Sequence, residues 1–281
     1  MLMKTITYKQ IENFKNHLII QEKSGNTCEK YIRDITTFMI WLDGKEATKL
    51  LTLEYKKEIC EKYAPRSVNA TISSLNSFFQ FMEWYDLRIN ALKIQRQIFS
   101  NEKKELTKVE YERLLIAAKN KNNERLYHLM QTICSTGIRV SELRYITVSA
   151  IKSGRATINC KGKMRIVILP KKLCKILKEY IKKKNIKDGA VFISRNGKPL
   201  DRSYIWKMLK SLCDIANVSK DKVFPHNFRH LFARTYYSLQ KDIVRLADIL
   251  GHSNVNTTRI YTMESGEVHR TQIQQLGLLI S

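Results

Sequence analysis

Residues 225–262 read PHNFRHLFARTYYSLQKDIVRLADILGHSNVNTTRIYT, and the architecture of the C-terminal part of this chain follows from the helices that they predict. The segment carries three histidines, several arginines and a late tyrosine. On a helix that begins at its proline, His226, Arg229 and His230 share one face, because residues three and four apart are neighbours on a helix surface. One face of this helix is therefore cationic and rich in imidazole.

A second helix follows in the same segment, with apolar residues at helical spacing, namely Ile243, Leu246, Ile249 and Leu250. Gly251 is the residue type that ends a helix in the left-handed conformation, and His252 comes directly after it. Asn254 or Asn256 can cap a further short helix that carries Tyr261. Positive charge, imidazoles and one phenol at consecutive helix ends indicate chemistry on a phosphodiester.

The composition agrees with a polyanionic partner. The chain has 281 residues, enough for two domains, and 50 Lys and Arg against 26 Asp and Glu give a net charge of +24. An excess of this kind favours nucleic acid, although a lysine-rich surface of low specificity would also produce it. No apolar run approaches the length of a membrane span, and the six scattered cysteines indicate reduced thiols. We expect a cytoplasmic protein without a membrane partner.

The N-terminal part predicts a small helical bundle over residues 1–90. Four amphipathic patterns lie at residues 8–22, 27–42, 51–63 and 68–82. Their polar faces carry side chains that hydrogen-bond phosphates and base edges, although each one alone is also typical of a solvated surface: Lys30, Arg33, Arg66, Asn69 and Asn76. This part therefore predicts a DNA-binding domain.

Residues 91–105 lose the helical pattern and become polar and basic, so we interpret them as a linker before a domain over 106–281. Thr107 and Glu110 have capping-box spacing and open a helix. In the segment TGIRVSEL, Arg139 lies near a helix start and Glu142 three residues on, close enough to orient the guanidinium. Such an arginine suits a phosphate. A surface Arg–Glu pair is the alternative.

A β-hairpin comes next. Residues 156–159 and 164–169 have the composition of strands, and residues 160–163 form the tight turn between them. Lys161 or Lys163 can reach from the turn into a neighbouring groove, whereas an ordinary solvated lysine is the commoner case. Beyond it we expect a lysine-rich helix (171–187), a third short strand (191–193) and a helix (202–215) that starts at Arg202. The fold class is mainly α with a small antiparallel β-sheet.

These segments together resemble a known family, the tyrosine recombinases, which include phage integrases and Xer-type and Cre-type site-specific recombinases. The resemblance rests on TGIRVSEL, KGKMRIVILP, VFISRNGKPLDR, HNFRH and LGHSNVNTTRIY, which have the family's order and spacing. NTCEKYIRDITTFMIWL and SVNATISSLNSFFQFM resemble its helical, SAM-like core-binding domain. The resemblance covers almost the whole chain and implies an N-terminal core-binding bundle followed by a mixed α/β catalytic domain. The members of the family that it resembles are Xer-like, and we expect no arm-binding domain.

The resemblance also assigns roles to individual residues. Arg139 and Arg229 would stabilise the phosphate charge, and Glu142 would support the first arginine. His226, the other member of the H-x-x-R pair, would accept the proton of the nucleophile, and His252 stands in the later His/Trp position. Tyr261 would be the nucleophile. The hairpin departs from the family's usual G-K-G-x-x-K/R-x-R, because CKGKMR is one residue shorter and begins with cysteine. Lys161 aligns best as the catalytic lysine, and Lys163 remains open. Lys163 and Arg202 are also candidates for DNA contact.

The implied reaction is cleavage and rejoining of double-stranded DNA through a 3′-phosphotyrosyl intermediate, without a cofactor, a metal or ATP. The implied assembly is a homotetramer on inverted half-sites, monomeric in solution, acting through a Holliday junction. The tail at 265–281 would dock on a neighbouring protomer. Whether a partner recombinase or accessory protein takes part stays open.

Three other functions compete with this interpretation. A type IB topoisomerase uses the same side chains to relax one duplex, and a catalytically silent DNA-binding protein would share the bundle and the charge. A metalloenzyme is disfavoured, because the helix with His226 and His230 lacks the glutamate of a zinc helix and places Arg229 between them.

Overall fold

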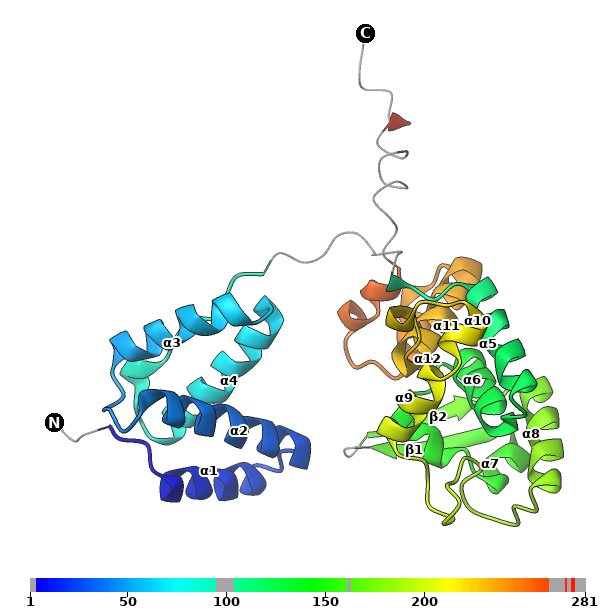
Figure 1. Ribbon diagram of the computed structural model, residues 1–281, viewed down its shortest axis with the longest axis horizontal. Helices are drawn as coiled ribbons and strands as arrows, with labels where there is room; N and C mark the ends of the chain where they lie inside the picture. Colours follow the sequence, from blue (N-terminus) through cyan, green and yellow to red (C-terminus); the bar gives the residue numbers. More distant parts are fainter. Residues whose placement is uncertain (1–3, 95–103, 161–162, 263–270, 272–273, 276–281) are drawn as a thin grey trace, which may run out of the picture. The chain divides into compact units, whose positions relative to one another are not determined.

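The computed structural model describes residues 4–94, 104–160, 163–262, 271 and 274–275. The chain divides into two compact units, Met1–Arg96 and Gln97–Ser281, which Figure 1 shows as separate groups of helices. Most of the expected linker (95–103), Lys161 and most of the tail (263–270, 272–273 and 276–281) lie outside the described residues. No helix in the described part of the chain is long and apolar enough to cross a membrane.

The N-terminal unit is built from α1 (Tyr8–Ile20), α2 (Gly25–Leu42), α3 (Lys49–Lys62) and α4 (Pro65–Phe81), followed by the short 3₁₀ helix η1 (Tyr85–Leu87). Local signals set these bounds. Thr7 and Gln10 form a capping box at the start of α1, and Asp43 ends α2 in the left-handed conformation. Pro65 occupies the first turn of α4, where its missing N–H costs nothing.

The expected apolar faces make the core of this unit. Phe14, Phe38, Phe78 and Phe79 are fully buried, and the rings of Phe14 and Phe78 meet edge to face at 5.4 Å. The core positions the polar faces of α2 and α4 on the outside.

Two asparagines that we expected to contact DNA form hydrogen bonds within this fold. The Asn69 amide donates to the backbone of Leu92 and accepts from it, at 3.0 and 2.7 Å. Asn76 makes the same pair of bonds with Ile89, at 2.8 and 2.9 Å. Both amides thus hold the segment that leaves α4, and the DNA interface proposed below leaves them out.

The second unit contains eight α-helices and one β-hairpin in its described residues. The helices are α5 (Lys108–Asn120), α6 (Glu124–Thr136), α7 (Val148–Ser153), α8 (Lys171–Lys183), α9 (Arg202–Lys210), α10 (Cys213–Ala216), α11 (Pro225–Gln240) and α12 (Ile243–Leu250). The hairpin pairs β1 (Arg155–Cys160) with β2 (Lys163–Ile168) in antiparallel register, from Arg155 opposite Ile168 to Cys160 opposite Lys163. The mainly helical fold with a small antiparallel sheet confirms the expected class.

Two glycines fix the turns that matter for the site. Gly137 ends α6 at φ 62°, and a Cβ there would lie 2.5 Å from the Phe232 ring. Gly251 ends α12 at φ 65°, and a Cβ there would lie 2.3 Å from Cδ of Arg165. Both positions need the left-handed conformation and leave no space for a side chain.

Two expectations for the second unit were wrong. Residues 191–193 do not form a strand, because their backbone bonds go to different neighbours: the Val191 N–H donates to Ile146, whereas the Phe192 carbonyl accepts from Leu200. Only isolated bridges result. The helix expected over 202–215 is broken at Ser211, where α9 ends, and α10 begins at Cys213.

Candidate active site

The expected catalytic side chains lie on four elements that meet in the second unit. Arg139 precedes the 3₁₀ helix η3 (Val140–Tyr145), and His226 and Arg229 lie on the first turns of α11. His252 follows the stop of α12, and Tyr261 closes the 3₁₀ helix η6 (Arg259–Tyr261). The structure brings these five side chains together.

Arg229 is the buried centre of the site, with 2% of its surface exposed. Its Nη1 donates to the carbonyl of Gly137 at 2.5 Å, and its Nη2 donates to the carbonyl of Leu250 at 2.8 Å. Nη2 also lies 2.9 Å from Nε2 of His252. Burial and then the charge of Arg139 lower the pKa of Arg229 to about 10, so the guanidinium stays charged at neutral pH. Two helix ends therefore hold one fixed positive charge.

Arg139 is oriented by Glu142, as the spacing predicted. The Arg139 backbone N–H donates to Oε2 of Glu142 at 3.0 Å, and its Nη1 donates to Oε1 at 3.1 Å. The Arg139 side chain keeps 39% of its surface exposed, whereas that of Glu142 keeps 5%. Arg139 therefore has donors left over for an anion.

Sequence reasoning missed a second arginine on Glu142. Nη2 of Arg165, in β2, donates to Oε2 of Glu142 at 2.6 Å, and Nη1 donates to the Ile249 carbonyl at 2.8 Å. Burial alone would raise the pKa of Glu142, but these hydrogen bonds and charges hold it below its usual value. Strand alternation was the available signal, because Arg165 lies two residues before the buried Val167 and thus on the inner face.

Tyr261 lies inside this arrangement, with 3% of its surface exposed. Its ring is 4.4 Å from that of His230, 6.0 Å from that of His252 and 6.4 Å from that of His226, measured between centroids. The Tyr261 side chain also acts on Arg229, where it opposes the lowering of the pKa. The Tyr261 phenol thus lies beside the Arg229 guanidinium of its own chain.

The three histidines are neutral at neutral pH. His226 is exposed at the surface, yet the atoms packed around its ring partly desolvate it and lower its pKa, and Arg229, Arg139 and Arg202 lower that pKa further. Burial, followed by nearby positive charge, lowers the pKa of His252 and of His230 to about 4. A neutral imidazole can accept a proton, so His226 is ready to act as a base.

A cavity of about 370 Å³ opens onto three of the catalytic candidates, Arg139, His226 and Arg229. Its polar lining comes from Arg139, Ser141, Arg202, His226 and Arg229, and the half-exposed Trp206 forms an apolar wall. Arg202, which we expected to contact DNA, therefore lies among the catalytic candidates. The cavity offers an anion several cationic donors beside the aromatic side chains of Trp206 and Phe224.

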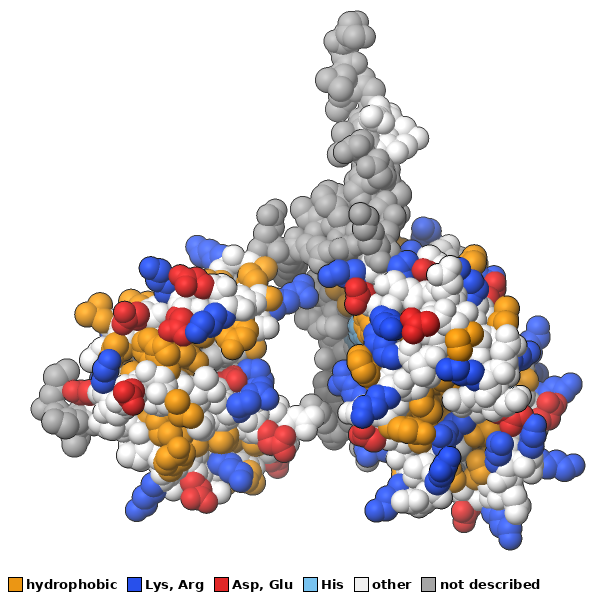
Figure 2. All heavy atoms as spheres, viewed as in Figure 1, with side chains coloured by type: hydrophobic (Ala, Val, Ile, Leu, Met, Phe, Trp, Pro, Cys, Tyr) orange, Lys and Arg blue, Asp and Glu red, His pale blue; other side chains and the backbone are white. Residues whose placement is uncertain are grey.

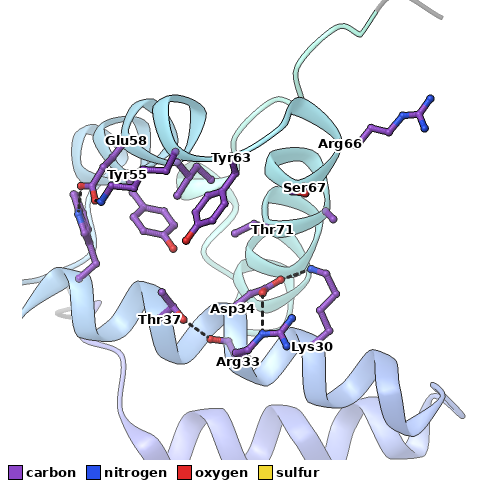
Figure 3. Close-up of a pocket in the computed structure, with 14 residues that line it drawn as sticks. Lys30, Arg33, Asp34, Thr37, Tyr55, Glu58, Tyr63, Arg66, Ser67 and Thr71 are labelled. Atoms are coloured by element: carbon purple, nitrogen blue, oxygen red, sulfur yellow. Dashed lines mark hydrogen bonds and ion pairs between the residues drawn. The ribbon is translucent and has the colours of Figure 1, made fainter. Parts of the chain in front are cut away.

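A second hollow, of about 640 Å³, lies in the N-terminal unit between α2, α3 and α4. Lys30, Arg33 and Arg66 are among its lining residues, so three of the expected DNA contacts share one place. Figure 3 shows Lys30 and Arg33 gathered at Asp34, while Arg66 points away at the rim. Asp34 is held by the Ser74 hydroxyl at 2.7 Å. On the face shown in Figure 2, each unit carries many basic side chains.

The described side chains do not form a metal site. Over the residues that the structure describes, no three His, Cys, Asp or Glu side chains lie together as a metal site would require. The rings of His226 and His230 pack edge to face at 4.9 Å.

Comparisons with known proteins agree with this geometry. Residues 104–267 match the profile of the phage integrase family, and residues 11–85 match that of the phage integrase N-terminal SAM-like domain. A tyrosine recombinase of Thermosipho africanus is 32% identical over 90% of this chain and 94% of its own length. Tyrosine recombinase XerA of Pyrococcus furiosus is 27% identical over 98% of this chain and 96% of its own length.

The fold is shared with solved structures as well. A lambda integrase tetramer bound to a Holliday junction superposes with a TM-score of 0.72 at 17% identity, over 90% of this chain and 76% of the other. Profile, relatives and fold thus point the same way as the residues gathered around Tyr261. The chain belongs to the phage integrase family of tyrosine recombinases and is a DNA strand-transferring enzyme of site-specific recombination.

Proposed function

We propose that Tyr261 cleaves DNA by attacking a phosphodiester that Arg139 and Arg229 hold. The Tyr261 oxygen bonds to phosphorus, the bond from phosphorus to the 5′-oxygen breaks, and a 3′-phosphotyrosyl ester and a free 5′-hydroxyl result. The ester keeps the energy of the broken bond, so a 5′-hydroxyl of another strand can reverse the step without ATP. The observation that carries this proposal is the position of Tyr261 beside Arg229 within one chain.

The two arginines divide the electrostatic task. Arg229 has fixed partners on two helix ends, so its position is set before DNA arrives. Arg139 is more exposed, and it lines the 370 Å³ cavity together with Arg229. Charge grows on the phosphate oxygens in the transition state, and a donor placed in advance typically stabilises it by roughly 3 kcal/mol.

Two proton transfers complete the reaction. His226, neutral in the free protein, accepts the Tyr261 proton during attack. The departing 5′-oxygen takes a proton from the hairpin lysine, a role that we assign to Lys161, with Lys163 as the alternative. His252 donates to a non-bridging phosphate oxygen.

DNA binding and assembly follow from the same proposal. The hollow with Lys30 and Arg33, with Arg66 at its rim, contacts the duplex, and Arg202 contacts the backbone near the cleaved phosphate. The domains are a core-binding unit (1–90), a linker (91–105) and a catalytic unit (106–281). Four protomers act on paired sites with inverted half-sites, as the lambda neighbour's tetramer suggests, and the 265–281 tail docks between them. We place the protein in the cytoplasm, monomeric before it meets DNA.

Suicide substrates test the reaction. Duplexes that tile the DNA flanking the gene, each carrying a nick, would be incubated with the wild type and with Tyr261→Phe. We expect a covalent protein–DNA band at one site for the wild type, and none for the variant. A covalent band formed by Tyr261→Phe would overturn the proposal, as would a linkage to the 5′ end. Relaxation of plasmids without any such site would favour the topoisomerase alternative, which the family assignment does not support.

A further inference from the structure

The hydrogen bonds around His252 determine which ring nitrogen carries its proton. Nε2 of His252 lies 2.9 Å from Nη2 of Arg229, and Nδ1 lies 2.8 Å from the Thr258 hydroxyl. A guanidinium has donors only, so Nε2 must be the acceptor. The proton of the neutral ring is then on Nδ1, which donates to the oxygen of Thr258.

Thr258 also belongs to the turn that carries the nucleophile. It is fully buried, and its carbonyl accepts the backbone N–H of Tyr261 at 2.9 Å. The rings of His252 and Tyr261 lie nearly parallel, 14° apart. Thr257, its neighbour in the chain, is exposed. One threonine of the pair therefore connects the imidazole to the tyrosine turn.

We propose that Thr258 is a positioning residue whose hydroxyl keeps the His252 proton on Nδ1 and leaves Nε2 to accept from Arg229, which lines the cavity. Without this acceptor, a proton on Nε2 would face an N–H of Arg229. The ring would then turn away or Arg229 would lose one of its partners. Thr258 thus acts on the site through His252 and does not itself touch DNA.

The hydrogen bond from Nδ1 of His252 to Thr258 also matters when DNA binds, and this step rests on the function proposed above. An unprotonated Nε2 next to a phosphate oxygen would repel it, so His252 must gain a proton there before it can donate. In the free protein, burial lowers the pKa of His252, and the groups that face it lower that pKa further, namely Arg229, Arg139, Arg165 and His226. A bound phosphate brings the opposite charge. Because Nδ1 already donates to Thr258, the incoming proton goes to Nε2, which ends the contact with Nη2 of Arg229 and frees that donor for the phosphate.

The proton position can be measured without DNA. In the full-length protein labelled with ¹⁵N-histidine, two-bond ¹H–¹⁵N spectra distinguish a protonated ring nitrogen from an unprotonated one, and His252→Gln assigns the signal. We expect Nδ1–H in the wild type, in Thr258→Ser and in the matched control Thr257→Val. Thr258→Val should lose it. A wild type with the proton on Nε2, or an unchanged signal in Thr258→Val, would refute the inference.

Cleavage supplies the second measurement. On a suicide substrate we expect Thr258→Val to form the covalent complex about tenfold more slowly, the effect of one hydrogen bond. Thr258→Ser and Thr257→Val should keep the wild-type rate. Equal rates for Thr258→Val and Thr257→Val would rule out the positioning role. If the wild type cleaves nothing, the proposed function fails, whereas the spectra still decide the proton position. If Thr258→Val does not fold, the wild-type and Thr258→Ser spectra decide it.

Discussion

A buried guanidinium stays charged only where its donors have partners, and Arg229 shows how such partners are supplied. Its bonds go to the carbonyls of Gly137 and Leu250, the ends of two helices. Carbonyls at a helix C-terminus lack partners of their own and carry partial negative charge. The charge of Arg229 is thus stabilised by the backbone and remains available to a phosphate.

Arg229→Lys should therefore lose cleavage, although it keeps the charge. An ammonium lacks the planar fork that spans both carbonyls, so we expect a fall of about two orders of magnitude in single-turnover cleavage. Arg234→Lys is the matched control on the same helix, since Arg234 pairs with Glu105 instead. A variant at position 229 that cleaves within a few fold of the wild type would contradict the assigned role.

The histidines make stability depend on pH. Burial, helped by His226 and Arg234, lowers the pKa of His230 to about 4, against an ordinary 6.5. Between these values the unfolded chain binds a proton that the folded chain does not, so stability is lost as pH falls through that window. His230→Gln should reduce this loss by about 1–2 kcal/mol at pH about 5. Thermal unfolding of the wild type and of His230→Gln from neutral to acidic pH measures this loss. Equal pH dependence in the two proteins would contradict the prediction.

At the scale of elements, Arg165 connects three of them. From β2 it reaches Glu142 at the start of η3 and the carbonyl of Ile249 near the end of α12. Its side chain also fills the space beside Gly251. The hairpin, the first arginine and the turn before His252 therefore share one contact, and a shift of any one moves the others.

Gly251→Ala tests this contact. The new methyl group would lie 2.3 Å from Cδ of Arg165, whose far end is held by two partners. Gly154→Ala is the control, because φ is similar at 72° and nothing lies within 4 Å of its Cβ. Both variants incur the strain of positive φ, roughly 1 kcal/mol. We expect Gly251→Ala alone to lose cleavage as well, and equal losses would exclude the contact.

Over the whole molecule, the sequence predicted those features that depend on residues close together in the chain. Capping at Thr107 and the stop at Gly251 appear where expected, and the family motifs marked the residues that meet at Tyr261. The contacts that the sequence did not predict join residues far apart in the chain. Arg165 and Ile249 are 84 positions apart, and no helical or strand period relates them. The bonds of the Asn69 and Asn76 amides were not predicted, because the segment that engages them returns only after α4 has ended.

Electrostatic binding to DNA is also a property of the whole molecule, since the net charge is +24. Arg33→Gln and Arg66→Gln should each weaken binding at low salt and reduce the slope of log affinity against log salt by about 1. Lys9→Gln, on α1 and away from the hollow, is the control. Fluorescence anisotropy over a salt series measures the slopes. Unchanged slopes for both arginine variants would remove the hollow from the interface.

The burial of Tyr261 against Arg229 of its own chain has a genetic corollary. Under the function proposed above, each subunit cleaves with its own Tyr261 and Arg229. Two inactive alleles, one lacking the phenol and the other the arginine, therefore cannot complement each other. Co-expressed in one cell, they should remain as inactive as either alone, and each should be dominant over the wild type wherever mixed assemblies form.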